Sequence, residues 1–319
     1  MKNILITGVS GFAGSYLAEH LVSKKEFDIY GTYLLEESKV NVSHIKDKLK
    51  LVKADLSSSS QVFDIIKKIR PSLIFHLAAL TSPGDSFKNP GETITNNVTL
   101  QINLLEAVVN NSLFNTRILI VSSADIYGLV DKKDLPIDED TKLMPTSPYS
   151  VSKIAQDFLG LTYHLSYALK IIRVRPFNHI GPRQSPNFVV ASFAKQIAEI
   201  EKGKRKPVLS VGNLETKRDF TDVRDMVRAY KLAIDKGKIG QVYNIGSGVS
   251  YKISDILNKL VSMSTSKIKI EKEEDLMRPG DNPELVCDPS KFVKLTHWKP
   301  EISIETTLKD TLDYWRKII

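Results

Sequence analysis

Short apolar runs alternate with amphipathic stretches along most of the chain. The runs are rich in Ile, Leu and Val, which is typical of buried parallel strands, while the stretches between them follow a helical repeat. Residues 12–24 show this repeat, because Ala13, Leu17 and Leu21 recur at four-residue intervals. The pattern predicts strands near residues 3–7, 27–33, 50–53, 72–77, 117–122, 171–175 and 242–245.

This alternation predicts an α/β fold, in which a doubly wound parallel sheet carries helices on both faces. The sequence pattern changes after Arg175-Pro176, where prolines interrupt the chain and basic loops separate the predicted helices and strands. A smaller, interleaved C-terminal lobe is expected to begin there. The predicted boundaries are 1–175 for the first unit, with 219–262 returning to it, and 176–218 with 263–319 for the second unit.

Composition narrows the class of protein. The 319 residues are 42% apolar and 26% charged, the balance of a water-soluble globule, and no apolar stretch approaches the roughly 20 residues of a membrane helix. Basic residues spread over the whole length give the net charge of +8, so we expect anionic small molecules rather than nucleic acid as partners. Cys287 is the only cysteine, and the six histidines lack the spacing of metal sites, so we expect no metal. A cytoplasmic location is expected, since the chain starts directly with a strand pattern.

A glycine-rich turn follows the first predicted strand. Its sequence, Thr7-Gly8-Val9-Ser10-Gly11-Phe12-Ala13-Gly14, leads directly into a helix, as a dinucleotide-binding turn requires. Gly8 permits the tight turn, Gly11 lets a pyrophosphate approach the backbone, and Gly14 lets the helix pack closely on the strand. The free N–H groups of the helix N-terminus attract the same anion. The turn therefore predicts a Rossmann domain that binds a dinucleotide.

Further positions fit the same coenzyme. Asp55 follows the third strand, where its carboxylate can accept from the adenine amino group while Leu56 covers the ring; capping the next helix is the alternative role for Asp55. Small residues in Leu77-Ala78-Ala79, at the end of the fourth strand, leave room for the ribose and the nicotinamide. The second strand ends in Gly31-Thr32-Tyr33-Leu34, without an acidic residue for NAD or an arginine for a 2′-phosphate, and Glu36-Glu37 lies too far along the chain to decide. The choice between NADP and NAD stays open.

A tyrosine and a lysine four residues apart form a candidate catalytic pair. Tyr149 and Lys153 share one face of a predicted helix that Ser147 caps and Pro148 begins. Activity near neutral pH requires lowering the pKa of the phenol by about 3 units, which Lys153 and the nicotinamide cation can provide together. Ser123 closes the fifth strand and points a hydroxyl into the same crevice; a turn serine is the alternative. The three residues predict proton donation to a substrate oxygen while hydride moves at the attached carbon.

These motifs resemble those of the extended short-chain dehydrogenase/reductase family. The resemblance covers nearly the whole chain and rests on TGVSGFAG (7–14), HLAA (76–79), SSADIYG (122–128), YSVSK (149–153) and RPFN (175–178). Three later segments, 177–201, 211–230 and 277–291, are similar to the GDP-mannose branch of this family. Within that branch, FNHIGP and RDFTDVRD are nearer to the reductases than to the dehydratases.

The resemblance implies roles for particular residues. Ser123, Tyr149 and Lys153 would form the catalytic group, with Asp125 in the place where the dehydratases carry a glutamate as base. The side chain of Asp125 is one methylene shorter, which argues against the dehydratase; capping a helix is its alternative role. The positions implied for the coenzyme are Gly8, Gly11, Phe12, Ala13, Gly14, Asp55, Leu56, Leu77, Ala78, Ala79, Tyr149, Lys153 and Pro176. Those implied for a sugar nucleotide, on the smaller lobe and beside it, are Ser123, Asn178, Val189, Lys195, Arg218 and Arg278.

The charges of the last group agree with such a ligand. A nucleoside diphosphate carries about two negative charges, and an arginine fork binds phosphate oxygens bidentately. For Arg218 and Arg278 a surface ion pair is the alternative role, and for Lys195 a solvated place on an amphipathic helix.

The resemblance implies a reductase. NAD(P)H would give hydride to C4 of GDP-4-keto-6-deoxy-D-mannose while Tyr149 supplies the proton and Ser123 polarises the carbonyl, so that the product is GDP-D-rhamnose. A GDP-mannose 4,6-dehydratase and a nucleotide-sugar 4-epimerase are alternatives within the family, and a non-catalytic sugar-nucleotide sensor is the alternative outside enzymes. Helices near 92–110 and 148–168 would form a four-helix bundle between two copies, so a homodimer is expected.

Overall fold

A parallel sheet forms the centre of the protein, whose computed structural model describes residues 2–277 and 282–319. Within these ranges the sheet has seven strands in the order β10-β6-β5-β4-β1-β2-β3, each parallel to its neighbours. This order confirms the predicted doubly wound sheet, and each strand lies where an apolar run predicts it. The bounds are β1 Lys2–Thr7, β2 Phe27–Tyr33, β3 Lys50–Lys53, β4 Leu73–His76, β5 Arg117–Val121, β6 Lys170–Pro176 and β10 Val242–Ile245.

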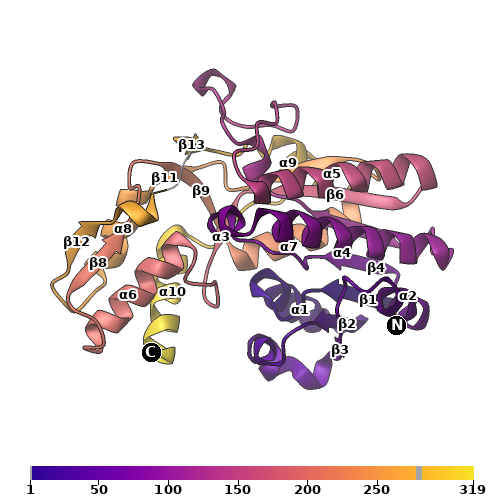
Figure 1. The fold of residues 1–319 in the computed structure, drawn as a ribbon, viewed down its shortest axis with the longest axis horizontal. Helices are drawn as coiled ribbons and strands as arrows, with labels where there is room; N and C mark the ends of the chain where they lie inside the picture. Colours follow the sequence, from indigo (N-terminus) through magenta and orange to yellow (C-terminus); the bar gives the residue numbers. More distant parts are fainter. Residues whose placement is uncertain (1, 278–281) are drawn as a thin grey trace.

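Helices cover both faces of this sheet because successive strand residues point to opposite sides. Ile118 and Ile120 of β5 pack in the core beneath the helices α2, α4 and α5, whereas Leu119 packs on the other side with α1 and α7. Figure 1 shows α4 and α5 running side by side over one face. The bounds are α1 Phe12–Lys24, α2 Ser59–Ile69, α3 Pro83–Lys88, α4 Pro90–Asn110, α5 Pro148–Tyr167, α7 Val223–Lys236 and α9 Ser290–Thr296. Short 3-10 segments are η1 Glu36–Lys48, η2 Ala124–Tyr127, η3 Lys132–Asp134 and η4 Glu274–Leu276.

The smaller lobe, on the left of Figure 1, has its own apolar core. Its helices pack around Val190, Phe193, Ile256 and Leu308. Strand β9 pairs with β7, β11 and β13, while β8 and β12 form a separate parallel pair. The bounds are α6 Val189–Glu201, α8 Ile253–Ser262, α10 Ile304–Ile318, β7 Asn178–Ile180, β8 Val208–Val211, β9 Lys217–Asp222, β11 Ser250–Lys252, β12 Lys269–Lys272 and β13 Glu284–Leu285. In the described ranges, none of the helices combines the length and apolar character that crossing a membrane requires.

The chain passes between the two lobes more finely than the predicted boundaries allow. Helix α7 and strand β10, both within residues 219–262, pack with the central sheet. Strand β9 and helix α8 of that range pack in the smaller lobe instead, because their apolar side chains face α6 and α10. Helix α9, assigned by its sequence to the second unit, places Phe292 against Tyr243 of the central sheet.

A buried carboxylate anchors α5 to the sheet. Asp157 of α5 accepts from Arg173 Nη1 at 2.6 Å and from Arg175 Nε at 2.9 Å, and all three side chains are buried. Arg175 also donates to the hydroxyl of Tyr127 at 2.9 Å, and that hydroxyl donates to Asn244 Oδ1 at 2.7 Å. The network joins α5, β6, η2 and β10, so it fixes the helix that carries Tyr149.

We expect Asp157→Asn to lower the free energy of unfolding by about 3–5 kcal/mol, because two buried guanidinium groups lose their counter-charge. Asp235→Asn is the control, since Asp235 pairs with Lys231 on the surface of α7, where an ion pair contributes at most about 1 kcal/mol. Urea denaturation followed by circular dichroism measures both changes. A loss below about 1 kcal/mol for Asp157→Asn would show that α5 does not depend on this carboxylate.

Candidate active site

The local sequence fixes where α5 begins. Ser147 Oγ accepts from the backbone N–H of Ser150 at 3.1 Å, and Ser150 Oγ accepts from the N–H of Ser147 at 3.0 Å. Pro148 occupies the first helical position, where a missing N–H costs nothing. This capping box confirms the predicted start of the helix and places Tyr149 in its first turn.

Tyr149 and Lys153 lie buried where β5 ends. Lys153 Nζ donates to the carbonyl oxygen of Val121 at 3.0 Å and lies 6.0 Å from the centre of the Tyr149 ring. Ser122 Oγ donates to the carbonyl oxygen of Lys153 at 3.1 Å. The last residue of β5 and the residue after it therefore hold the lysine beside the phenol.

Ser123 completes this group. Its hydroxyl accepts from the backbone N–H of Asp125 at 3.1 Å, which caps η2, and its side chain is hydrogen-bonded to Tyr149. The structure thus brings Ser123, Tyr149 and Lys153 together, with the charge of Asp125 close enough to act on the phenol. The turn-capping role weighed for Ser123 is present in addition to its contact with Tyr149.

The pKa values in this group depend mainly on burial. Burial raises the pKa of Tyr149 above its ordinary value, the charge of Asp125 raises it further, and the hydrogen bond from Ser123 lowers it. The lowered pKa expected from the sequence depends on Lys153 and the nicotinamide cation together. In the chain alone burial dominates, because a phenolate loses more by leaving water than its neighbours return. Burial also lowers the pKa of Lys153 to about 7. At neutral pH the phenol is therefore protonated and can donate.

Two glycines of the turn occupy positions with no room for a side chain. Gly8 has a φ of +69°, and a Cβ there would lie 3.0 Å from Cα of Ala78. A Cβ on Gly14 would lie 2.2 Å from the carbonyl oxygen of Gly8, so the helix approaches the turn as closely as the sequence predicted. Gly11 precedes α1, whose first turn has neither a side-chain cap nor an acidic residue. The N–H groups at this helix start are free to face an anion.

The strand end beside this turn is held by Thr7. Its hydroxyl accepts from the N–H groups of Leu77 and Ala78 at 3.1 and 3.2 Å, so its hydrogen points to His76 Nδ1, 2.9 Å away. Burial, and then the charge of Lys153, lower the pKa of His76 to about 3. His76 is therefore neutral and structural. Thr7 joins β1 to the segment Leu77-Ala78-Ala79 that follows β4.

The residues after β3 form a turn of their own. Asp55 Oδ1 accepts from the N–H and the hydroxyl of Ser57 at 2.9 and 2.7 Å, and these bonds lower the pKa of Asp55. Leu56 is buried. Asp55 thus organises the turn before α2, and its carboxylate remains at the surface.

The residues implied for a sugar nucleotide lie on several elements of the smaller lobe. Asn178 begins β7 and Val189 begins α6. Arg218 Nη1 donates to the carbonyl oxygens of Lys217 and Asn282, each at 2.8 Å. Arg278 lies outside the described residues. Pro176 ends β6, directly before this group.

Lys195 stands apart from these residues. Its ammonium lies 3.6 Å from Glu199 one turn along α6 and 5.8 Å from the centre of the Trp315 ring on α10. This is the surface position weighed as its alternative role.

A buried aspartate fixes the strand that carries Arg218. Asp219 accepts from the N–H groups of Ser247, Gly248 and Cys287 at 2.8, 2.9 and 3.2 Å. Burial raises the pKa of Asp219, while these hydrogen bonds lower it. The bonds join β9 to the loop after β10 and to the segment that follows β13.

The structure shows contacts between α1 and the segment after β6 that the sequence analysis did not predict. The rings of Phe12 and His179 stack with their centres 5.8 Å apart and their planes at 2°. Tyr16 donates to the carbonyl oxygen of Pro182 at 3.3 Å, and Arg183 lies 2.6 Å from Glu19. The only signal in the sequence is a histidine beside Asn178 in an otherwise apolar run. Within residues 2–277 and 282–319, no three His, Cys, Asp or Glu side chains are grouped so that they could hold a metal ion.

Comparisons with known proteins agree with this arrangement. A family model described as GDP-mannose 4,6 dehydratase matches residues 5–311. GDP-6-deoxy-D-mannose reductase of Pseudomonas aeruginosa is 32% identical over 314 residues, which cover 98% of this chain and 97% of that protein. The structure of RMD from Pseudomonas aeruginosa complexed with NADPH superposes with a TM-score of 0.86 at 30% identity and covers the whole of both chains.

An epimerase has the same fold. The UDP-glucose 4-epimerase of Thermus thermophilus, in complex with NAD, superposes with a TM-score of 0.87 at 26% identity, covering 99% of this chain and 100% of that one. Nearly full-length matches to the family model and to these proteins, together with the glycine turn and the Ser123, Tyr149 and Lys153 group, place the chain. It belongs to the GDP-mannose 4,6 dehydratase family, within the extended short-chain dehydrogenases/reductases.

Proposed function

We propose that this chain is an NAD(P)-dependent oxidoreductase that reduces the C4 keto group of GDP-4-keto-6-deoxy-D-mannose to give GDP-D-rhamnose. The observation that carries the proposal is the meeting of Ser123, Tyr149 and Lys153 at the end of β5. The likeness to the reductase of Pseudomonas aeruginosa over nearly the whole chain supports this substrate.

The residues of the site suit a reduction. NAD(P)H supplies hydride when bound. Tyr149 donates its proton to the C4 oxygen, since the phenol is protonated at neutral pH. Ser123 donates a hydrogen bond to the same oxygen, and Lys153 holds the ribose beside the phenol.

The glycine turn supports the coenzyme site, since a Cβ on Gly8 or Gly14 would fill the space beside the backbone. We propose that Gly8, Gly11, Phe12, Ala13 and Gly14 hold the pyrophosphate. Further along the coenzyme we propose adenine contacts from Asp55 and Leu56, ribose and nicotinamide contacts from Leu77, Ala78 and Ala79, and a nicotinamide contact from Pro176. For the sugar nucleotide we propose Ser123, Asn178, Val189, Arg218, Arg278 and, with the least support, Lys195.

A 4,6-dehydratase is the second candidate. It is supported by the description of the family and by the charge of Asp125, which acts on Tyr149 from the place of the dehydratase base. The reductase is favoured because the aspartate arm is short, and because a net reduction by NAD(P)H needs only a proton donor from the protein, which the site provides.

Purified protein given GDP-4-keto-6-deoxy-D-mannose is expected to consume one equivalent of NADPH or NADH per sugar reduced, because hydride leaves the coenzyme permanently. Absorbance at the dihydronicotinamide band measures consumption, and NMR of the product identifies the configuration at C4. The control reaction contains GDP-mannose alone. Turnover of GDP-mannose without added coenzyme would instead establish the dehydratase.

Tyr149→Phe is expected to lower kcat by about 10²–10⁴-fold, since the proton donor is lost, while leaving coenzyme affinity within about twofold. Tyr167→Phe is the matched control, because Tyr167 is an exposed tyrosine at the end of the same helix. Steady-state kinetics and coenzyme titration measure the two effects. Full activity in Tyr149→Phe would exclude the proposed donor.

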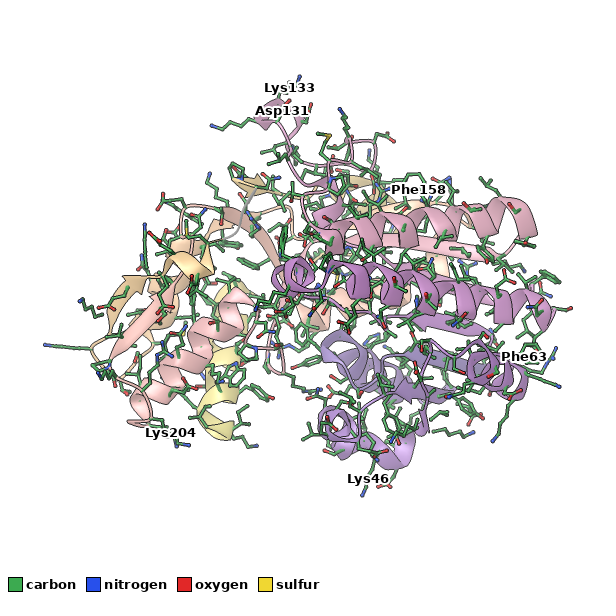
Figure 2. The ribbon with its side chains drawn as sticks, viewed as in Figure 1. Lys46, Phe63, Asp131, Lys133, Phe158 and Lys204 are labelled. Carbon is green, nitrogen blue, oxygen red and sulfur yellow. The ribbon has the colours of Figure 1, made fainter. Side chains whose placement is uncertain are left out.

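We also propose a homodimer, located in the cytoplasm. Val151, Phe158 and Leu165 recur every seven residues on α5 and are 43%, 46% and 72% exposed. Figure 2 shows Phe158 on the outer side of this helix. A seven-residue apolar repeat suits packing against another helix, and α4 lies alongside α5, so two copies could join these pairs into a four-helix bundle. The single, buried cysteine suits a reducing compartment.

Phe158→Glu is expected to convert the dimer to a monomer, because a charge in the centre of the helix bundle would be desolvated. Ile270→Glu is the control, since Ile270 is exposed on β12 of the smaller lobe, far from α5 (Figure 1). Sedimentation velocity measures the mass of each variant. A monomeric unmodified protein, or a dimer that survives Phe158→Glu, would rule out this interface.

A further inference from the structure

Four polar side chains gather where β2 ends, and we call them the β2-end cluster: Tyr33, Glu36, Lys39 and Lys53. The hydroxyl of Tyr33 donates to Glu36 Oε1 at 3.1 Å. Lys39 Nζ lies 2.6 Å from Glu36 Oε2, and Lys53 Nζ lies 3.5 Å from Oε1. Lys39 Nζ is also 5.1 Å from the centre of the Tyr33 ring. One carboxylate therefore holds two ammonium groups in place.

Hydrogen bonds from the glycine turn to β2 fix the position of this cluster. The N–H of Val9 donates to the carbonyl oxygen of Thr32 at 3.0 Å, and the N–H of Gly8 donates to the Thr32 hydroxyl at 3.3 Å. Strand β3 places Lys53 directly beside Tyr33 in the register of the sheet.

The first half of η1 is hydrogen-bonded to the glycine turn. Ser38 Oγ lies 2.7 Å from Ser10 Oγ, and Asn41 Nδ2 donates to the carbonyl oxygen of Ser10 at 2.9 Å. In a Rossmann domain the adenosine ribose lies beside the end of the second strand. The β2-end cluster is therefore at the position of the ribose 2′ group.

The charges of the cluster favour an anion there. Two lysines and one glutamate give a formal charge of 2 − 1 = +1. In NAD-binding domains a carboxylate at this place accepts from the ribose 2′-hydroxyl. The carboxylate of Glu36 already accepts from Tyr33 and pairs with both lysines, and its hydrogen bond from Lys39 lowers its pKa, so it stays ionised as their anchor. The lysine side chains are 39% and 60% exposed and can reach a ligand at the surface.

Building on the proposed function, we propose that the β2-end cluster makes the coenzyme site prefer NADPH to NADH. Lys39 and Lys53 bind the 2′-phosphate, which carries about −1.5 to −2 charges at neutral pH, and Glu36 positions them. These are lysine contacts on two different elements, η1 and β3, in place of a single arginine after β2.

The test is direct titration of the purified protein with NADPH and with NADH, without sugar nucleotide. We expect NADPH to bind at least about tenfold more tightly, the effect of one added phosphate ion pair, and the ratio to shrink as salt screens these exposed charges. Lys39→Ala and Lys53→Ala are each expected to weaken NADPH binding severalfold and to leave NADH binding within about twofold. Isothermal titration calorimetry measures both dissociation constants.

Lys46→Ala is the matched control. It removes the same charge from η1, but Figure 2 shows Lys46 at the outer edge of the molecule, pointing away from the sheet. We expect it to leave the NADH-to-NADPH ratio of dissociation constants unchanged. A shift as large as that of Lys39→Ala would show that overall charge, and not the cluster, sets the preference, and would overturn the inference.

The outcomes separate this inference from the proposed function. Equal affinity for the two coenzymes, or tighter binding of NADH, would overturn the role of the cluster and leave the reductase proposal standing. Binding of neither coenzyme would overturn both. A preference for NADPH that both lysine variants retain would also overturn it, because the 2′-phosphate would then be bound elsewhere.

Discussion

The burial of one carboxylate between two arginines is the constraint on which the active-site geometry depends. Asp157 lies one turn after Lys153 and two turns after Tyr149 on α5, so all three share a face of the helix. Because Arg173 and Arg175 hold Asp157 against β6, the phenol and the ammonium are held at the end of β5. Removing three charged groups from water is expensive, so we interpret this network as fixing position rather than adding stability.

The central sheet was predictable because its signals are local. Each strand is a short apolar run, the first helix follows a glycine turn, and α5 starts at a serine and a proline. The smaller lobe lacks such signals. Its strands β7, β11 and β13 have two or three residues, and every residue of β12 is exposed, so neither length nor hydrophobic periodicity marks them. The sequence-based boundaries place α8 with the central sheet, but α8 packs in the smaller lobe. An amphipathic pattern does not show which of two cores the apolar face of a helix contacts.

The candidate site divides in a similar way. Ser123, Tyr149 and Lys153 could be found because strand ends and helix spacing bring them together. The direction of the Tyr149 pKa shift could not be found, since it depends on how deeply tertiary packing buries the ring. The stack of Phe12 on His179 joins residues far apart in the chain. Glu36 is too far along the sequence from the end of β2 to be assigned to it, but η1 places its carboxylate on the hydroxyl of Tyr33. Contacts between distant segments leave no trace in a single sequence.

The interleaving of the two lobes has a mechanical consequence. The chain leaves the central sheet after β6, returns with α7, leaves again for β11 and α8, returns with α9 and ends in α10. Several covalent tethers therefore span the junction, and the link between Arg183 and Glu19 adds a non-covalent one. A domain joined by one linker can rotate as a rigid body, whereas several chain crossings resist such a rotation. Ligands must then enter through movement of individual loops. The spacing between the coenzyme site on the central sheet and the sugar-nucleotide site on the smaller lobe is set when the protein folds.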